Sequence, residues 1–135
     1  FGSIGHGYTY SGHPVGCAAG IAALAETRRL KLDENAAARG KDLAQALAAL
    51  KAKHALVGDV RGKGLMAALE LVADRDSKKP ADKKTMAKVA GAAYEAGVML
   101  RVSGNNLILS PPLILTSLDV KAIADGIDAG LSAAG

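Results

Sequence analysis

Residues 5–20 read GHGYTYSGHPVGCAAG, and they place two different patterns side by side. The first half is rich in glycine, tyrosine and small hydroxyl side chains, a composition typical of turns. Pro14 suits the first turn of a helix, because the backbone N–H that it lacks would have no partner there. The next residues are small and apolar on all sides. The pattern predicts a loop over residues 1–13 and a helix from Pro14 to about Leu32, whose first half we expect to be buried.

Helical periodicity predicts three further helices along the chain. Asp33 is a candidate cap for the second, which carries Leu43, Leu47 and Leu50 on one face. The third is expected over residues 82–96, with Gly97 as its C-terminal stop. Thr116 and Asp119 predict a capping box at the start of the last helix.

Strand character is confined to the segments between these helices. Residues 65–72 form a short apolar run, and Gly62 and Gly64 ahead of it indicate a bulge or a tight entry into the strand. The segments VMLRV and NLILS, joined by SGN, predict a hairpin over residues 98–110. With the helices, this order predicts an α+β fold: a small, mostly antiparallel sheet with helices on one face.

Composition excludes several classes of function. The chain has 135 residues, half of them apolar, which is enough for one domain with a core. The net charge of +4 is spread along the chain without basic clusters, which argues against a nucleic-acid partner. The single cysteine, Cys17, excludes an internal disulfide and suits a reducing compartment. The histidines are too scattered for a metal site. No apolar run is long enough to span a membrane, and with the single cysteine this leads us to expect a cytoplasmic protein.

Three residues are candidates for a functional role, and each has a simpler interpretation. The hydroxyl and N–H of Thr9, in a loop flanked by glycines, could hold a phosphate oxygen or could serve the turn itself. Arg101 ends an apolar stretch just before the hairpin turn. It could offer its planar fork to a carboxylate, or it could be an edge-strand arginine with its head in solvent. His13 is more simply read as bonding its own turn ahead of Pro14.

Three motifs together resemble one enzyme family. HGYTYSGHPVGCAAGIAAL (6–24) resembles the segment that opens the C-terminal part of class III, fold-type I, pyridoxal-phosphate-dependent aminotransferases. DVRGKGLMAALELV (59–72) and GVMLRVSGNNLILSPPLILT (97–116) resemble the family's later strand and hairpin segments. Within the class, the chain is most similar to the ω-amino acid:pyruvate group. The resemblance covers nearly the whole chain.

The resemblance implies roles for the candidate residues. Tyr8 and Thr9 match a pair that reaches across a homodimer interface, with Thr9 at the phosphate of the partner's pyridoxal phosphate and Tyr8 lining the substrate pocket. Arg101 matches a mobile arginine that pairs with a substrate carboxylate. By the same resemblance, residues 1–32 are an interface loop and helix leading out of a large cofactor domain, and residues 33–135 are the C-terminal small domain. The implied reaction moves an amino group from an amine or ω-amino acid to pyruvate or a similar keto acid.

The resemblance also implies what this segment lacks. The family's Schiff-base lysine precedes the matched region, so we expect a fragment that begins at Phe1 to be inactive alone and to contain no catalytic residue of its own. Two alternatives remain open. One is a glutamate-semialdehyde aminomutase or an ornithine-type enzyme of the same class, against which the His13-Pro14 pair argues mildly. The other is a stand-alone, non-enzymatic α+β binding module.

Overall fold

The computed structural model describes residue 2 and residues 5–135, and the chain divides into two compact units between Leu32 and Asp33. Residues 1, 3 and 4 of the expected interface loop lie outside the described residues. The first unit consists of a loop and helix α1 (Pro14–Arg29). His13 caps this helix, since its Nδ1 accepts a hydrogen bond from the Gly16 N–H at 3.4 Å. The simpler interpretation of His13 is therefore the one that the structure shows.

The expectation that the first half of α1 is buried is wrong for the described residues of this chain. The helix has no buried residue, and Val15, Ile21 and Leu24 are each more than half exposed. Among the described residues of the first unit only a loop accompanies this helix, and that loop leaves the helix exposed.

The second unit is an α+β domain, as the sequence predicts. Its elements follow the order helix, strands, helix, hairpin, helix. They are α2 (Leu32–Lys53), β1 (Val57–Lys63), β2 (Met66–Asp74), β3 (Lys79–Pro80), α3 (Lys83–Glu95), β4 (Arg101–Ser103), β5 (Asn106–Leu109) and α4 (Ser117–Ala134). The expected capping box of the last helix is present, with Thr116 and Asp119 each bonding the other's backbone N–H.

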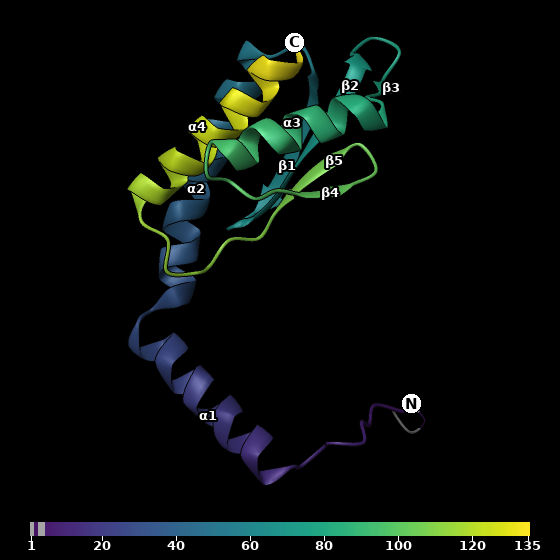
Figure 1. Ribbon diagram of the computed structural model, residues 1–135. Helices are drawn as coiled ribbons and strands as arrows, with labels where there is room; N and C mark the ends of the chain where they lie inside the picture. Colours follow the sequence, from purple (N-terminus) through teal and green to yellow (C-terminus); the bar gives the residue numbers. More distant parts are fainter. Residues whose placement is uncertain (1, 3–4) are drawn as a thin grey trace. The chain divides into compact units, whose positions relative to one another are not determined.

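The sheet is antiparallel throughout and has the order β1-β2-β5-β4, with β3 paired to the end of β2 (Figure 1). Leu69 and Leu107 are cross-strand partners and are fully buried. They pack in one core with leucines of α2 and with apolar residues of α3 and α4. The opposite face, called the open face below, carries the exposed Arg61 and Arg101 and the half-buried Ala68, Glu70, Asn106 and Ile108. The predicted arrangement, with helices on one face of a small antiparallel sheet, is confirmed.

The first hairpin has the expected tight entry into the strand at Gly64, but it differs from the sequence expectation in its extra strand and in the place of its bulge. Residues 57–63 form a strand of their own, and Gly64, with φ +57°, begins the turn into β2. A glycine at the first position of a tight hairpin turn accommodates this backbone conformation. The only register shift between β1 and β2 lies between Val57 and Asp59, so the bulge surrounds Gly58 rather than Gly62. Gly62 is instead an in-register partner of Ala67.

The C-terminal end of α2 is held by Arg75, the residue that follows β2. The Arg75 guanidinium donates hydrogen bonds to the carbonyl oxygens of Val57 at 3.0 Å, His54 at 2.7 Å and Lys51. These carbonyls belong to the last turn of the helix and the segment that follows it, where intrahelical partners run out. One side chain thus closes the connection from α2 to β1.

No helix within the described part of the chain combines the length and the apolar character that crossing a membrane requires.

Candidate functional site

The loop before α1 presents Thr9 at the corner of a turn. The Ser11 N–H donates to the Tyr8 carbonyl at 2.9 Å, and the Tyr8 N–H donates to the Ser11 hydroxyl at 3.0 Å. These two bonds close the turn without using Thr9, whose hydroxyl and N–H bond no other described residue. Tyr8 is 70% exposed, and its ring meets that of His6 edge-on at 5.2 Å. The loop therefore offers a hydroxyl, a backbone N–H and an aromatic ring on its surface.

Arg101 begins β4, the three-residue strand at the other edge of the sheet from β1. Its side chain is exposed and forms no hydrogen bond or ion pair with any described residue. A hollow of about 240 Å³ lies beside it, lined by Met99, Leu100, Ile108, Ser110 and Pro111 together with Arg101 itself. Arg101 thus contributes to the wall of a mostly apolar recess that also includes Leu109 and Ile123, and its guanidinium has its full hydrogen-bonding capacity available.

The hairpin that carries Arg101 is tied to the centre of the sheet at its turn. Gly104 has φ +59°, and Ser103 and Asn106 pair across the turn. Asn105 bonds β2 twice, because its side-chain amide donates to the Leu71 carbonyl at 2.8 Å and its own carbonyl accepts from the Leu71 N–H at 2.8 Å. Asn105 ends the SGN segment that predicted the hairpin, but nothing in the sequence marked its bonds to Leu71.

A network of charged and polar groups covers the open face between β1 and β5. Arg61 donates to the Glu70 carboxylate at 2.9 Å and to the Asn106 side-chain oxygen at 2.6 Å. Asp59 lies 3.4 Å from the same guanidinium. The ammonium group of Lys51, bonded at 3.3 Å, holds the pKa of Asp59 below its usual range. No sequence pattern marked this network, because the bonds of Arg61 to Glu70 and Asn106 depend on strand order and register.

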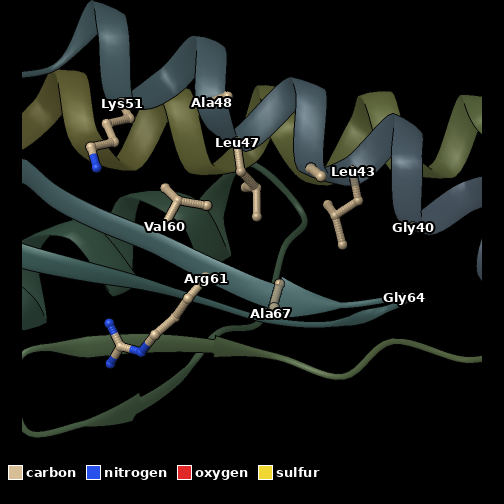
Figure 2. A pocket seen from close by; sticks show the side chains of 11 residues that line it. Gly40, Leu43, Leu47, Ala48, Lys51, Val60, Arg61, Gly64 and Ala67 are labelled. Atoms are coloured by element: carbon tan, nitrogen blue, oxygen red, sulfur yellow. The ribbon is translucent and has the colours of Figure 1, made fainter.

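A groove with a volume of about 580 Å³ lies between α2 and β1 (Figure 2). Figure 2 shows Leu43, Leu47 and Val60 between the helix and the strands, whereas Arg61 leaves the sheet on the side away from α2. The groove's titratable lining residues, Lys51 and Arg61, are both engaged in ion pairs. The groove therefore offers packing surface rather than acid–base chemistry.

The candidate residues fall into two places. Tyr8 and Thr9 share one turn of the first unit, and Arg101 belongs to the second. Within residue 2 and residues 5–135, no cluster of histidine, cysteine, aspartate and glutamate side chains could hold a metal ion. The chemistry that these residues offer is recognition of anions: a hydroxyl and an N–H at a turn, and an unpaired guanidinium at a sheet edge.

Comparison with known proteins assigns this chain to a family. The family model for class III aminotransferases matches residues 1–131. A diaminobutyrate–2-oxoglutarate transaminase from Halomonas elongata is 42% identical over 127 residues, covering 91% of this chain and 27% of that protein. A taurine–pyruvate aminotransferase from Bilophila wadsworthia is 40% identical over 127 residues, covering 89% and 28%. The chain therefore belongs to the class III aminotransferase family.

Solved structures agree with this assignment. An amine transaminase from an uncultivated Pseudomonas species, in its PLP-bound form, has a TM-score of 0.91 and 43% identity, covering 98% of this chain and 30% of that one. An (S)-enantioselective ω-transaminase from Thermomicrobium roseum has a TM-score of 0.86 and 36% identity, with the same coverages. The chain spans less than a third of the length of these relatives.

Proposed function

We propose that this chain is the C-terminal part of a pyridoxal-phosphate-dependent aminotransferase that passes an amino group from an amine or ω-amino acid to pyruvate or a similar keto acid. In this proposal residues 33–135 form the small domain, and residues 1–32 form a segment of the interface with a second copy. The observation that carries the proposal is Arg101. It is an exposed arginine at a sheet edge, and it has no partner among the described residues although other arginines of the same unit are paired.

An arginine of this kind suits a keto acid. A carboxylate accepts two parallel hydrogen bonds from a guanidinium, and this fork discriminates against neutral groups. The apolar recess beside Arg101 would face the carbon chain of the same molecule. Because the side chain lies on a short edge strand and is unpaired, it can turn toward a carboxylate or away when the substrate has none. The role proposed for Arg101 is therefore to bind the carboxylate of the acceptor.

The test compares two acceptors in the intact enzyme that contains this chain. Arg101→Ala should lower kcat/KM for pyruvate about ten- to hundredfold, because hydrogen bonds to charged groups contribute about 1.5–3 kcal/mol. Propanal has no carboxylate, so its kcat/KM should change less than about twofold. The measurement is steady-state kinetics with one amine donor. Equal losses on both acceptors would show that Arg101 does not recognise the carboxylate.

Thr9 is proposed to contact the phosphate of pyridoxal phosphate bound to the partner subunit, with Tyr8 lining the same pocket. The turn fits this group, because it leaves the Thr9 hydroxyl and N–H unused and places the Tyr8 ring at the surface. When bound, pyridoxal phosphate takes the amino group from the donor and delivers it to the acceptor. The residues of this chain bind and orient. None of its lysines lies in a sequence that resembles the family's cofactor-binding lysine, so the chain alone is proposed to be inactive.

The Thr9 contact can be tested with a pair of variants that differ in one hydroxyl. Thr9→Val in the intact enzyme should weaken pyridoxal phosphate binding about tenfold, since it removes a hydrogen bond to a charged group while keeping the shape. Thr9→Ser keeps the hydroxyl and should bind almost as tightly as the parent. Equilibrium dialysis of the cofactor measures both. An affinity for Thr9→Val that equals that of Thr9→Ser would remove Thr9 from the phosphate site.

Two further features support the proposed homodimer and its location in the cytoplasm. The open apolar surface of α1 and the exposed ring of Tyr10 are what a homodimer interface would cover. Cys17 is the single cysteine, and no disulfide within the chain is possible, which suits the cytoplasm. We therefore place the intact enzyme in the cytoplasm as a homodimer, acting on small amines and keto acids rather than on nucleic acid.

A further inference from the structure

The two exposed arginines of the sheet stand in one row. Arg61 on β1 pairs in register with Ala68, Ala68 pairs with Ile108, and Ile108 pairs with Arg101 on β4. Cross-strand partners project from the same face of a sheet. Arg61 projects away from α2 in Figure 2, so Arg101 belongs to the same open face at the opposite edge.

Arg61 reaches across a strand to the hairpin that carries Arg101. Its guanidinium bonds Glu70 on β2 and extends to Asn106 on β5, at 2.9 and 2.6 Å. Asn106 in turn is the register partner of Ser103 on β4, and its amide donates to the Ser103 carbonyl at 3.4 Å. Side chains therefore connect the β1 edge of the sheet to the strand of Arg101, beside the backbone ladder.

The hairpin has few other constraints at this end. β4 is three residues long and pairs only with β5, and β5 is four residues long. Arg101 bonds no described residue. The position from which its side chain extends is therefore set by the backbone of the hairpin alone. Segments with few buried contacts open locally more readily than the core does. Besides the pairing of β5 with β2 and the buried Leu107, the bonds of Asn105 to Leu71 and of Asn106 to Arg61 hold the turn against β2 and β1.

We infer that Arg61 is a positioning residue for Arg101: by holding Asn106, it fixes the β4–β5 hairpin and so presents the Arg101 guanidinium to the substrate carboxylate. The inference rests on the role proposed for Arg101. Arg61 itself does not contact substrate in this scheme, because Glu70 and Asn106 occupy its fork. Its removal should weaken binding of carboxylate acceptors and leave the chemical step and carboxylate-free acceptors unchanged.

The kinetic test uses the intact enzyme that contains this chain. Arg61→Ala and Asn106→Ala should each raise KM for pyruvate about three- to tenfold, the range of one lost hydrogen bond, with kcat changed less than about twofold. The double variant should show no further increase, since both changes break the same link. Arg39→Ala is the matched control, because Arg39 forms a comparable ion pair, 2.7 Å from Asp42, on α2. It should leave both constants unchanged.

Hydrogen exchange gives a readout that does not depend on activity. The peptide covering residues 98–110 should exchange faster in Arg61→Ala and Asn106→Ala than in the parent or in Arg39→Ala. The inference is overturned if Arg61→Ala leaves exchange of that peptide and KM for pyruvate unchanged while Arg101→Ala raises KM for pyruvate selectively. It is also overturned if Arg61→Ala raises KM for propanal as much as for pyruvate. If Arg101→Ala itself is unselective, the proposed function fails instead, and exchange still reports whether Arg61 holds the hairpin.

Discussion

Replacing Leu47 by alanine is expected to lower the free energy of unfolding by about 3 kcal/mol, within the range seen for buried leucines. Leu47 is completely buried on the inner side of α2 and belongs to the main core. It also lines the groove between α2 and β1, so the space left by its side chain would join an existing hollow. α2 carries most of its buried surface through leucines, and little else can move in to fill the gap.

The matched control is Leu118→Ala, at the start of α4. Leu118 is 77% exposed, so the same truncation there should change stability by less than about 0.5 kcal/mol. Urea unfolding of the 135-residue chain, followed by far-UV circular dichroism, measures both variants. Similar losses in the two variants would contradict the placement of Leu47 in the core.

Gly40→Ala is expected to lower the free energy of unfolding by about 2 kcal/mol, a typical cost of overpacking. A Cβ at Gly40 would lie 2.5 Å from the Gly64 Cα and 2.7 Å from its carbonyl carbon and oxygen. These are backbone atoms of the β1–β2 turn, so they cannot swing aside as a flexible side chain would. α2 and the hairpin would have to separate, although alanine is favoured over glycine within helices by about 1 kcal/mol.

Gly91→Ala is the control that measures the higher helix propensity of alanine without the steric clash expected at Gly40. Gly91 lies within α3, and a Cβ there would meet nothing within 4 Å. This variant should therefore be more stable than the parent by about 0.5–1 kcal/mol. The same urea titration compares the two alanine variants. If Gly40→Ala gained stability as Gly91→Ala does, α2 and the hairpin could not approach as closely as the structure has them.

Local signals predicted most of the second unit. The capping box at Thr116 and Asp119, the hairpin around Gly104 and the inner faces of the helices all follow from residues close together in sequence. β1 was missed because Gly58 and Gly62 alternate with charged residues and carry no side chain that would reveal a two-residue period. Burial of α1 was mispredicted because small apolar residues indicate a covered surface without indicating where the cover comes from.

The site was predictable only in part. Thr9 and Arg101 were selected from their local sequence, Tyr8 was added by the resemblance between motifs, and the roles of all three remain predictions. The network around Arg61 carried no local signal, because its bond to Asn106 joins residues 45 positions apart. Such a contact depends on the strand order β1-β2-β5-β4 and on register. Both are set by packing of the whole domain rather than by any short segment.

The three carbonyl bonds of Arg75 have a consequence for how the domain opens. They join the last turn of α2 to the segment before β3, so neither can loosen without breaking the same contacts. Partial unfolding of proteins proceeds in cooperative units rather than residue by residue. The C-terminal end of α2 and the turn after β2 should therefore unfold together, as one cooperative unit. Proteolysis of the exposed chain near Lys78 should then also destabilise the C-terminal end of α2.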